Sequence, residues 1–81
     1  MKFQISKQLD EILHKSDKNL REQVFKKIDK ILKLPELGKP LRYGLHGLRS
    51  ERIGVFRLIY EIKGDLIIFH TLEHRKKVYR K

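Results

Sequence analysis

The sequence predicts an α+β fold, with an N-terminal helical hairpin packed on a twisted antiparallel β-sheet in the order β-α-α-β-β-β. Residues 6–34 carry apolar side chains at helical spacing, whereas the apolar runs after Pro40 have the length and alternation of strands. Pro35 and Gly38 separate the two halves. The chain has 81 residues, so residues 1–81 are expected to form a single domain.

The N-terminal half is expected to form a short strand and two helices. Residues 2–5 alternate in polarity, Ser6 suits a helix N-cap, and the polar residues 16–19 separate the helices. The apolar positions expected to face the sheet are Leu9, Ile12, Leu13, Leu20, Val24, Ile28, Ile31 and Leu32, with Phe25 beside this stripe. Amphipathic helices also bind membranes or calmodulin, but the mixed charge of the polar face favours core packing.

The C-terminal half is expected to form strands at residues 49–53, 55–62 and 66–72, the last two joined by a tight turn at Lys63-Gly64-Asp65. Because side chains alternate along a strand, the middle strand has two distinct faces. One face carries Phe56, Leu58, Tyr60 and Ile62, and the other carries Val55, Arg57, Ile59 and Glu61. The helices are expected to cover the first face, which leaves Arg57 on the second.

The chain is strongly basic, with 20 Lys and Arg against 10 Asp and Glu and a formal net charge of +10. Residues 1–38 carry nine basic and six acidic side chains, and residues 39–81 carry eleven and four. This excess indicates a polyanionic partner, either a nucleic acid or an acidic protein. The alternative is a solvated, lysine-rich surface of the kind found in heat-stable proteins.

Several classes of site are excluded by composition and spacing. The chain has no cysteine, so disulfides, thiolate metal sites and cysteine nucleophiles are absent. No set of His, Asp and Glu has a metal-ligand spacing, and no glycine-rich loop suits a phosphate-bearing cofactor, so neither a metal nor a cofactor is expected. The N-terminus lacks a signal peptide, and the longest apolar run is too short for a bilayer. These features predict a cytoplasmic protein with no membrane partner.

Arg57 is the most informative single residue because it interrupts the apolar run of residues 55–60. Burying a charge without a partner is costly, so this position needs a reason. A guanidinium group binds a phosphate through two parallel hydrogen bonds and stays charged at cellular pH. The alternative is a cross-strand salt bridge to Glu61 or Glu73.

The last eight residues are the most basic stretch of the chain. They include five permanent cations suited to holding a polyanion, Arg75, Lys76, Lys77, Arg80 and Lys81. His74 and Tyr79 add groups able to transfer a proton. The alternatives are a frayed basic terminus, a histidine packed on the sheet and a tyrosine packed on its edge. His46 and His70 are weaker candidates for proton transfer.

Two motifs resemble those of the RelE/ParE superfamily of bacterial and archaeal toxins. Residues 52–60, Arg-Ile-Gly-Val-Phe-Arg-Leu-Ile-Tyr, are similar to its R-V-G-x-Y-R-x-x-Y strand pair, and residues 74–79, His-Arg-Lys-Lys-Val-Tyr, to its H-R-x-x-V-Y ending. The resemblance covers essentially the whole chain. It implies a toxin that a cognate antitoxin protein restrains.

The resemblance implies one of two activities. RelE-like toxins cut mRNA on the ribosome without a metal, using the ribose 2′-hydroxyl as the nucleophile, whereas ParE-like toxins poison DNA gyrase and cut nothing. The basic, proton-transferring tail favours the endoribonuclease. A nucleic-acid-binding member of the same fold without activity is a third possibility.

If the protein is a nuclease, the resemblance implies a role for each residue that matches a family motif. Arg57 would bind the scissile phosphate, Arg75 would stabilise charge in the transition state, Tyr79 would orient or deprotonate the hydroxyl, and His74 would act as acid or base. Arg49 and Arg52 would hold flanking RNA. Some RelE-like toxins have a glutamate base in the loop before the sheet, but residues 39–42 contain none, which leaves the general base unassigned.

Overall fold

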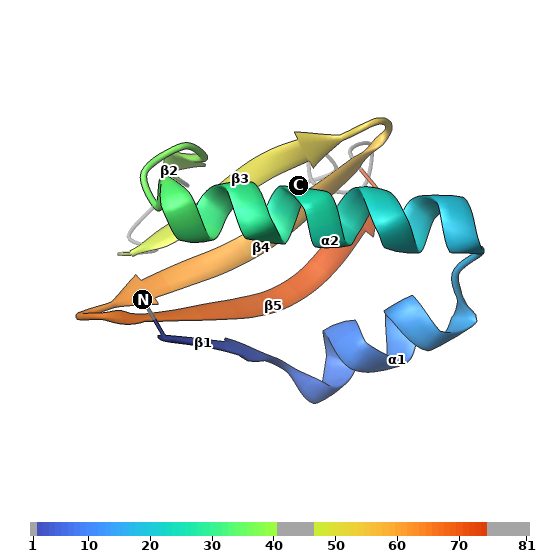
Figure 1. Ribbon diagram of the computed structural model, residues 1–81, viewed down its shortest axis with the longest axis horizontal. Coiled ribbons are helices and arrows are strands. Elements are labelled where there is room, and N and C mark those ends of the chain that lie inside the picture. The colour runs from blue at the N-terminus through green and yellow to red at the C-terminus, as the bar shows by residue number, and fades with distance from the viewer. Residues whose placement is uncertain (1, 41–46, 75–81) are drawn as a thin grey trace, which may run out of the picture.

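Two helices cover one face of a five-stranded sheet in the computed structural model of the chain, which describes residues 2–40 and 47–74 (Figure 1). The elements in chain order are β1 (Lys2–Ile5), α1 (Lys7–Lys15), α2 (Lys18–Lys33), β2 (Lys39–Pro40), β3 (Leu48–Ile53), β4 (Phe56–Lys63) and β5 (Leu66–His74). The predicted α+β fold is therefore confirmed. None of the helices within the described residues is long and apolar enough to span a bilayer.

Both helices begin at the predicted polar caps. The Ser6 side chain accepts a hydrogen bond from the Leu9 amide at 3.0 Å, and Asp17 accepts one from the Leu20 amide at 2.8 Å. Each bond satisfies an amide at a helix N-terminus that has no partner within the helix. The Ser6 hydroxyl also donates to the His70 carbonyl, so the same side chain attaches the start of α1 to β5.

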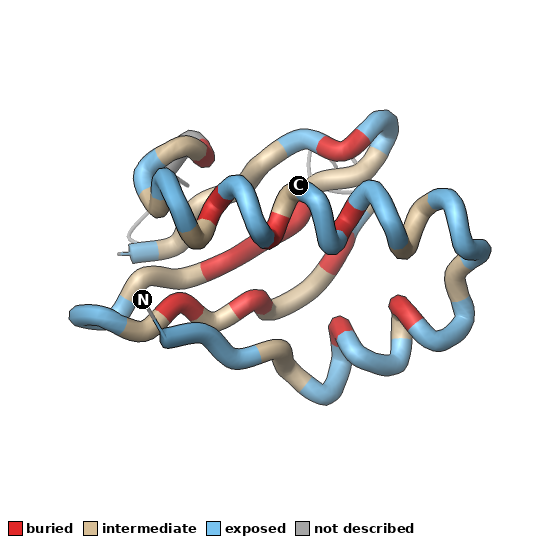
Figure 2. The backbone as a smooth tube through the Cα atoms, viewed as in Figure 1, coloured by how far each residue is buried: buried red, intermediate tan, exposed pale blue. Residues whose placement is uncertain are grey.

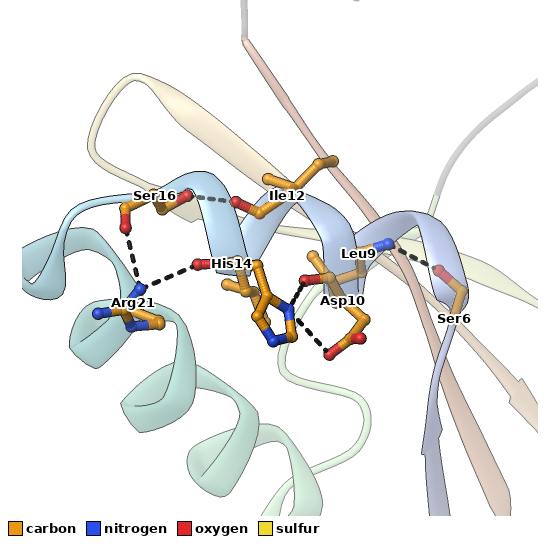
Figure 3. Close-up of polar contacts among 8 residues, drawn as sticks. Ser6, Leu9, Asp10, Ile12, His14, Ser16 and Arg21 are labelled. Atoms are coloured by element: carbon orange, nitrogen blue, oxygen red, sulfur yellow. Dashed lines mark hydrogen bonds and ion pairs between the residues drawn. The ribbon is translucent and has the colours of Figure 1, made fainter.

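The turn between the helices is fixed by side chains that cap the end of α1 (Figure 3). The Arg21 guanidinium donates to the carbonyls of Leu13 and Ser16 at 3.2 and 3.0 Å. The Ser16 hydroxyl donates to the Ile12 carbonyl at 2.7 Å. The last carbonyls of a helix have no partner within the helix, so these bonds stabilise the C-terminus of α1 and hold α2 against it.

The sheet order is β1-β5-β4-β3-β2. Strands β3, β4 and β5 pair antiparallel as predicted, and β2, a strand that the sequence did not predict, pairs antiparallel with β3. Strand β1 pairs parallel with β5, so the sheet is mixed. Antiparallel neighbours are commonly joined by tight hairpins, but the whole hairpin of helices separates β1 from the strands that follow. Chain connectivity therefore leaves the direction of β1 open. Strand β2, at the edge of the sheet next to β3, has only two residues. One of them is Pro40, which suits an edge position.

The hydrophobic core lies between the helices and one sheet face (Figure 2). Its fully buried side chains are Leu9, Val24, Ile31, Leu58, Tyr60, Ile67 and Phe69. On β4, Leu58 and Tyr60 are buried in this core and Phe56 and Ile62 pack at its margin, as the alternation predicts. Phe25 lies outside the core with 49% of its surface exposed.

Two glycine turns join the central strands. Gly54 lies between β3 and β4 with φ of 58°, and Gly64 lies between β4 and β5 with φ of 60°. Side chains other than glycine rarely adopt this left-handed region. The turn predicted at residues 63–65 is therefore confirmed, and the antiparallel β3–β4–β5 unit carries the candidate site.

Candidate nucleic-acid interface

Arg57 and Arg52 lie side by side on the sheet face opposite the helices. In the β3–β4 register Arg52 is the direct partner of Arg57, and in the β4–β5 register Arg57 is the direct partner of Glu73. Directly opposed residues in antiparallel strands have Cβ atoms about 4.5–5.5 Å apart, and like charges at this spacing destabilise the sheet. Two adjacent guanidinium groups are therefore well suited to share an anion such as a phosphate.

Glu61 and Glu73 are the two salt-bridge partners that the sequence suggests for Arg57. The Glu61 carboxylate lies 2.8 Å from His70 Nε2 and 4.0 Å from Lys63 Nζ. The other candidate, Glu73, is exposed and lies next to Arg57 in register. The row across the three strands therefore carries two cations and one carboxylate, which leaves a local excess of positive charge.

His70 lies on the same face as Arg57, at a β-bulge in the β4–β5 pair. Ile59 pairs with Thr71 and Tyr60 pairs with Phe69, so His70 is the extra residue. Its side chain bonds Glu61, which alternation places on the face away from the core. An imidazole–carboxylate pair therefore lies on the helix-free face.

Arg49 lies on the other face of β3 and binds the chain segment before β2. Its guanidinium donates to the Gly38 carbonyl at 2.7 Å and to the Glu36 carbonyl at 3.4 Å. Arg49 pairs in register with Tyr60, a core residue, so it points toward the helix side. The structure thus separates Arg49 from Arg52 and Arg57, and gives it a positioning role for residues 36–38.

The Tyr60 hydroxyl also binds the chain segment before β2, from the core side of the sheet. It donates to the Pro35 carbonyl at 2.8 Å and accepts from the Gly38 amide at 2.9 Å. Burial raises the pKa of the Tyr60 phenol, although the Gly38 amide and the Arg49 charge act in the opposite direction. The phenol is therefore neutral at cellular pH and keeps its proton for Pro35.

Gly38 is required by this close approach. A Cβ atom at position 38 would lie 2.6 Å from the Tyr60 hydroxyl and 2.8 Å from the Ser50 carbonyl. Real Cβ atoms do not approach other heavy atoms this closely, so any larger residue would push Tyr60 or β3 away. Arg49, Tyr60 and Gly38 together fix the entry into β2.

His74 ends β5 on the helix side of the sheet. It is the register partner of Phe56, and the two rings form an edge-to-face pair with centroids 5.6 Å apart and planes at 75°. Arg57, one residue further along β4, is on the opposite face. The alternation therefore does not bring the His74 ring to the face of Arg57.

A family model described as the ParE toxin of type II toxin–antitoxin system, parDE, matches residues 4–79. The chain belongs to the RelE/ParE family. No curated protein matches its sequence.

Solved structures of RelE/ParE toxins share the fold. The RelBE2 toxin–antitoxin complex from Mycobacterium tuberculosis contains a chain that superposes with a TM-score of 0.79 at 27% identity, covering 91% of this chain and 96% of that chain. The RelB–RelE complex from Methanococcus jannaschii gives a TM-score of 0.74 at 25% identity over 93% of both chains. The intact RelBE complex of E. coli gives 0.79 at 19% identity, covering 90% and 94%, a likeness that shows the fold.

Six of the predicted site residues of this RelE/ParE toxin lie outside the described residues. They are Arg75, Lys76, Lys77, Tyr79, Arg80 and Lys81. Their convergence on Arg57 stays a prediction. Within the described residues, the structure brings Arg52 together with Arg57 and places Arg49 and His74 on the helix side.

The acidic residue within the basic stretch of β3 is paired with α2. Glu51 Oε1 lies 3.3 Å from Lys27 Nζ, and both side chains are largely buried, with 20% and 24% of their surface exposed. Glu51 pairs in register with the core residue Leu58, so it too points to the helix side. Its charge therefore does not offset the cations on the helix-free face.

Sequence reasoning missed the Glu61–His70 pair. The turn at residues 63–65 predicts that β4 and β5 form a hairpin, which brings the two residues within a few positions of each other. Regular alternation from this turn already places Glu61 and His70 on one face, so the pairing of the two strands was the signal that could have found the pair.

Proposed function

We propose that this RelE/ParE toxin is a ribosome-dependent mRNA endoribonuclease that works without a metal. The observation that carries the proposal is the register that sets Arg52 directly opposite Arg57 on the sheet face that the helices leave open. Paired guanidinium groups match the oxygens of a phosphodiester. Further support comes from the two solved relatives at 25% and 27% identity, which are chains of RelB–RelE complexes.

Cleavage of the RNA backbone requires three catalytic contributions from the protein. A base removes the proton of the ribose 2′-hydroxyl, whose oxygen attacks the adjacent phosphorus. The bond from phosphorus to the 5′ oxygen breaks, and that oxygen takes up a proton. Cations must stabilise the additional negative charge on the phosphorane between these events.

In this proposal Arg57 binds the scissile phosphate and Arg52 holds the neighbouring backbone. The family resemblance gives Arg75 the role of stabilising charge in the transition state and gives Tyr79 a role in proton transfer. It gives His74 a similar role, but the His74 ring packs on Phe56 on the helix side, away from Arg57. Lys76, Lys77, Arg80 and Lys81 would add electrostatic affinity for RNA. Arg49 supports the site indirectly through its hold on residues 36–38.

The proposed partner is a cognate antitoxin. The solved relatives from Mycobacterium tuberculosis, Methanococcus jannaschii and E. coli are each in complex with a RelB antitoxin. A net charge of +10 favours an acidic or amphipathic partner. Binding of such a partner would also raise the stability of this small domain through mass action.

A second candidate function is poisoning of DNA gyrase. It is favoured by the matching family model, which is that of the ParE toxin. This activity needs a binding surface and no proton transfer, so the same cations would serve it in another way. The two functions predict different damage in cells.

The deciding experiment is induction of the toxin without an antitoxin, followed by mapping of transcript ends and of gyrase-linked DNA breaks. The nuclease proposal expects growth arrest with new 5′ ends inside translated regions, and expects Arg57→Ala to abolish both. Lys33→Ala is the matched control, because it removes one cation from an exposed position on α2. Growth arrest with trapped gyrase and intact transcripts would favour the second function. A folded Arg57→Ala toxin with full toxicity would refute the role of Arg57.

A further inference from the structure

A histidine–carboxylate pair lies on the same sheet face as Arg57. His70 Nε2 and Glu61 Oε1 are 2.8 Å apart, and the side chains are half-buried, with 38% and 21% of their surface exposed. A short hydrogen bond between an imidazole and a carboxylate fixes the tautomer and orientation of the ring. With Nε2 donating its proton to Glu61, Nδ1 carries a lone pair that accepts a proton.

The position of this pair relative to Arg57 follows from the register. Glu73 lies opposite Arg57, and His70 comes three residues earlier on β5, which is roughly 10 Å along the strand. Arg57 and His70 therefore lie on one face of the sheet, separated along the strands by this distance. Ile59, with 8% of its surface exposed, and its partner Thr71 form the floor between them.

Within the described residues, charged groups on this face come from β1, β3, β4 and β5, with Arg52 on β3. Glu61 and Lys63 belong to β4, with Lys63 Nζ 4.0 Å from the Glu61 carboxylate. Lys2 of β1 lies on the same face, because its register partner Leu66 is on β5 between the turn and Ile67 of the core. Arg57 and Glu73 lie at the other end. The imidazole–carboxylate pair is therefore set among cations of β1 and β4.

The proposed nuclease lacks an assigned base, because residues 39–42 contain no glutamate. We propose that His70, oriented by Glu61, is the general base that deprotonates the ribose 2′-hydroxyl while Arg57 holds the scissile phosphate. This assignment rests on the proposed nuclease function. Glu61 acts as a positioning residue, since it contacts the imidazole and not the RNA.

The proposed step conserves protons and electrons. The 2′-hydroxyl gives its proton to His70 Nδ1, and the oxygen forms a bond to phosphorus. The bond between phosphorus and the 5′ oxygen then breaks with its electron pair on oxygen, which takes a proton from water. The products are a 2′,3′-cyclic phosphate and a 5′-hydroxyl, and the imidazolium returns its proton to solvent.

The alternative is a pair that only stabilises the β4–β5 hairpin. The chain offers a comparison for this role on α1, where His14 Nδ1 lies 3.7 Å from Asp10 Oδ1 and the side chains are 75% and 62% exposed (Figure 3). His14 is far more exposed than His70, and its carboxylate contact is 0.9 Å longer. His14 therefore provides the matched control for loss of a histidine–carboxylate pair.

The test measures cleavage of mRNA on programmed ribosomes by the full-length toxin and three variants, each checked for folding by urea denaturation. For His70→Gln we expect kcat to fall roughly 100-fold or more with KM within about twofold of wild type, because general-base catalysis is worth about 10²–10⁴-fold. For Glu61→Gln we expect a fall of about 10-fold, because the ring loses its orienting partner. His14→Gln should leave the rate unchanged.

The pH profile separates a catalytic role from a structural one. The wild-type rate should fall toward acid pH as the base becomes protonated, and this dependence should disappear in His70→Gln. The loss of rate in Glu61→Gln, with KM unchanged, keeps the proposal testable should His70→Gln fail to fold. A folded His70→Gln toxin with the wild-type rate would overturn the proposal, as would a folded Glu61→Gln toxin with the wild-type rate. A wild-type toxin that cleaves no mRNA would overturn the proposed nuclease function instead.

Discussion

Removing the Tyr60 hydroxyl tests the attachment of residues 35–38 to the sheet. Tyr60→Phe keeps the ring and its contact with Phe69, whose centroid is 5.8 Å away. The variant loses both hydrogen bonds of the hydroxyl, one to the Pro35 carbonyl and one from the Gly38 amide. Since the ring fits the same space, the change isolates the two polar contacts.

The expected loss of stability follows from the burial of these partners. Gly38 is buried, so its amide would have no replacement partner, which costs about 1–3 kcal/mol. Pro35 is only half-buried, so water replaces part of the second bond and its loss costs about 1 kcal/mol. Together these terms predict that Tyr60→Phe lowers the free energy of unfolding by about 2–4 kcal/mol.

Urea denaturation followed by circular dichroism measures this loss. With a slope of about 1 kcal/mol per molar urea, the midpoint should fall by about 2–4 M. Ser16→Ala, which removes one half-buried hydrogen bond to the Ile12 carbonyl, is the control and should cost about 0.5–1.5 kcal/mol. Tyr60→Phe within about 0.5 kcal/mol of wild type would refute the argument that this hydroxyl holds the segment.

Three further predictions test the same contacts and the helix cap. Because its folded-state pKa is raised, Tyr60 contributes stability that is present below about pH 10 and lost as pH rises further, so wild-type stability should fall more steeply above pH 10 than that of Tyr60→Phe; parallel curves would contradict this. Gly38→Ala should lower the free energy of unfolding by about 2 kcal/mol or more, because its Cβ would lie 2.6 Å from the Tyr60 hydroxyl. An unchanged urea midpoint would show that residues 35–38 move to accommodate the Cβ at no cost in stability. Arg21→Ala should cost about 1–2 kcal/mol and speed hydrogen exchange of the α1 amides, since two carbonyls at the end of α1 lose their donor; unaltered exchange would rule out this cap.

Local patterns were sufficient to predict the helices and the faces of β4. Ser6 and the polar residues 16–19 mark helix ends because capping depends on residues a few positions apart. The two-residue alternation placed Arg57 on the face that the helices leave open. These signals need no knowledge of how distant segments meet.

The bulge at His70 explains why His74 lies opposite Phe56 on the helix side, away from Arg57. Glu61 pairs with Ile68, and an uninterrupted ladder from that pair would set Arg57 opposite Leu72. The extra residue instead brings Leu72 opposite Leu58 in the core and moves Glu73 next to Arg57. Burial of Leu72 stabilises this register, but the sequence does not reveal where the shift occurs.

Long-range contacts determine where the Arg49 side chain lies. Its charge suggested RNA binding, yet carbonyls of residues 36 and 38 take up its guanidinium. This attachment depends on the path of the chain between α2 and β3, which the loop sequence does not specify. The parallel pairing of β1 escaped prediction for a similar reason, since both helices separate it from the other strands.

The account depends most on the claim that the helix-free face handles the RNA backbone through Arg57. The direct measurement is the single-turnover rate of mRNA cleavage on programmed ribosomes for wild type, Arg57→Ala and Lys33→Ala. Loss of one charge stabiliser should cost about 2–4 kcal/mol, so Arg57→Ala should cleave roughly 30- to 1,000-fold more slowly while Lys33→Ala stays within about twofold of wild type. A folded Arg57→Ala toxin that cleaves at the wild-type rate would contradict the account.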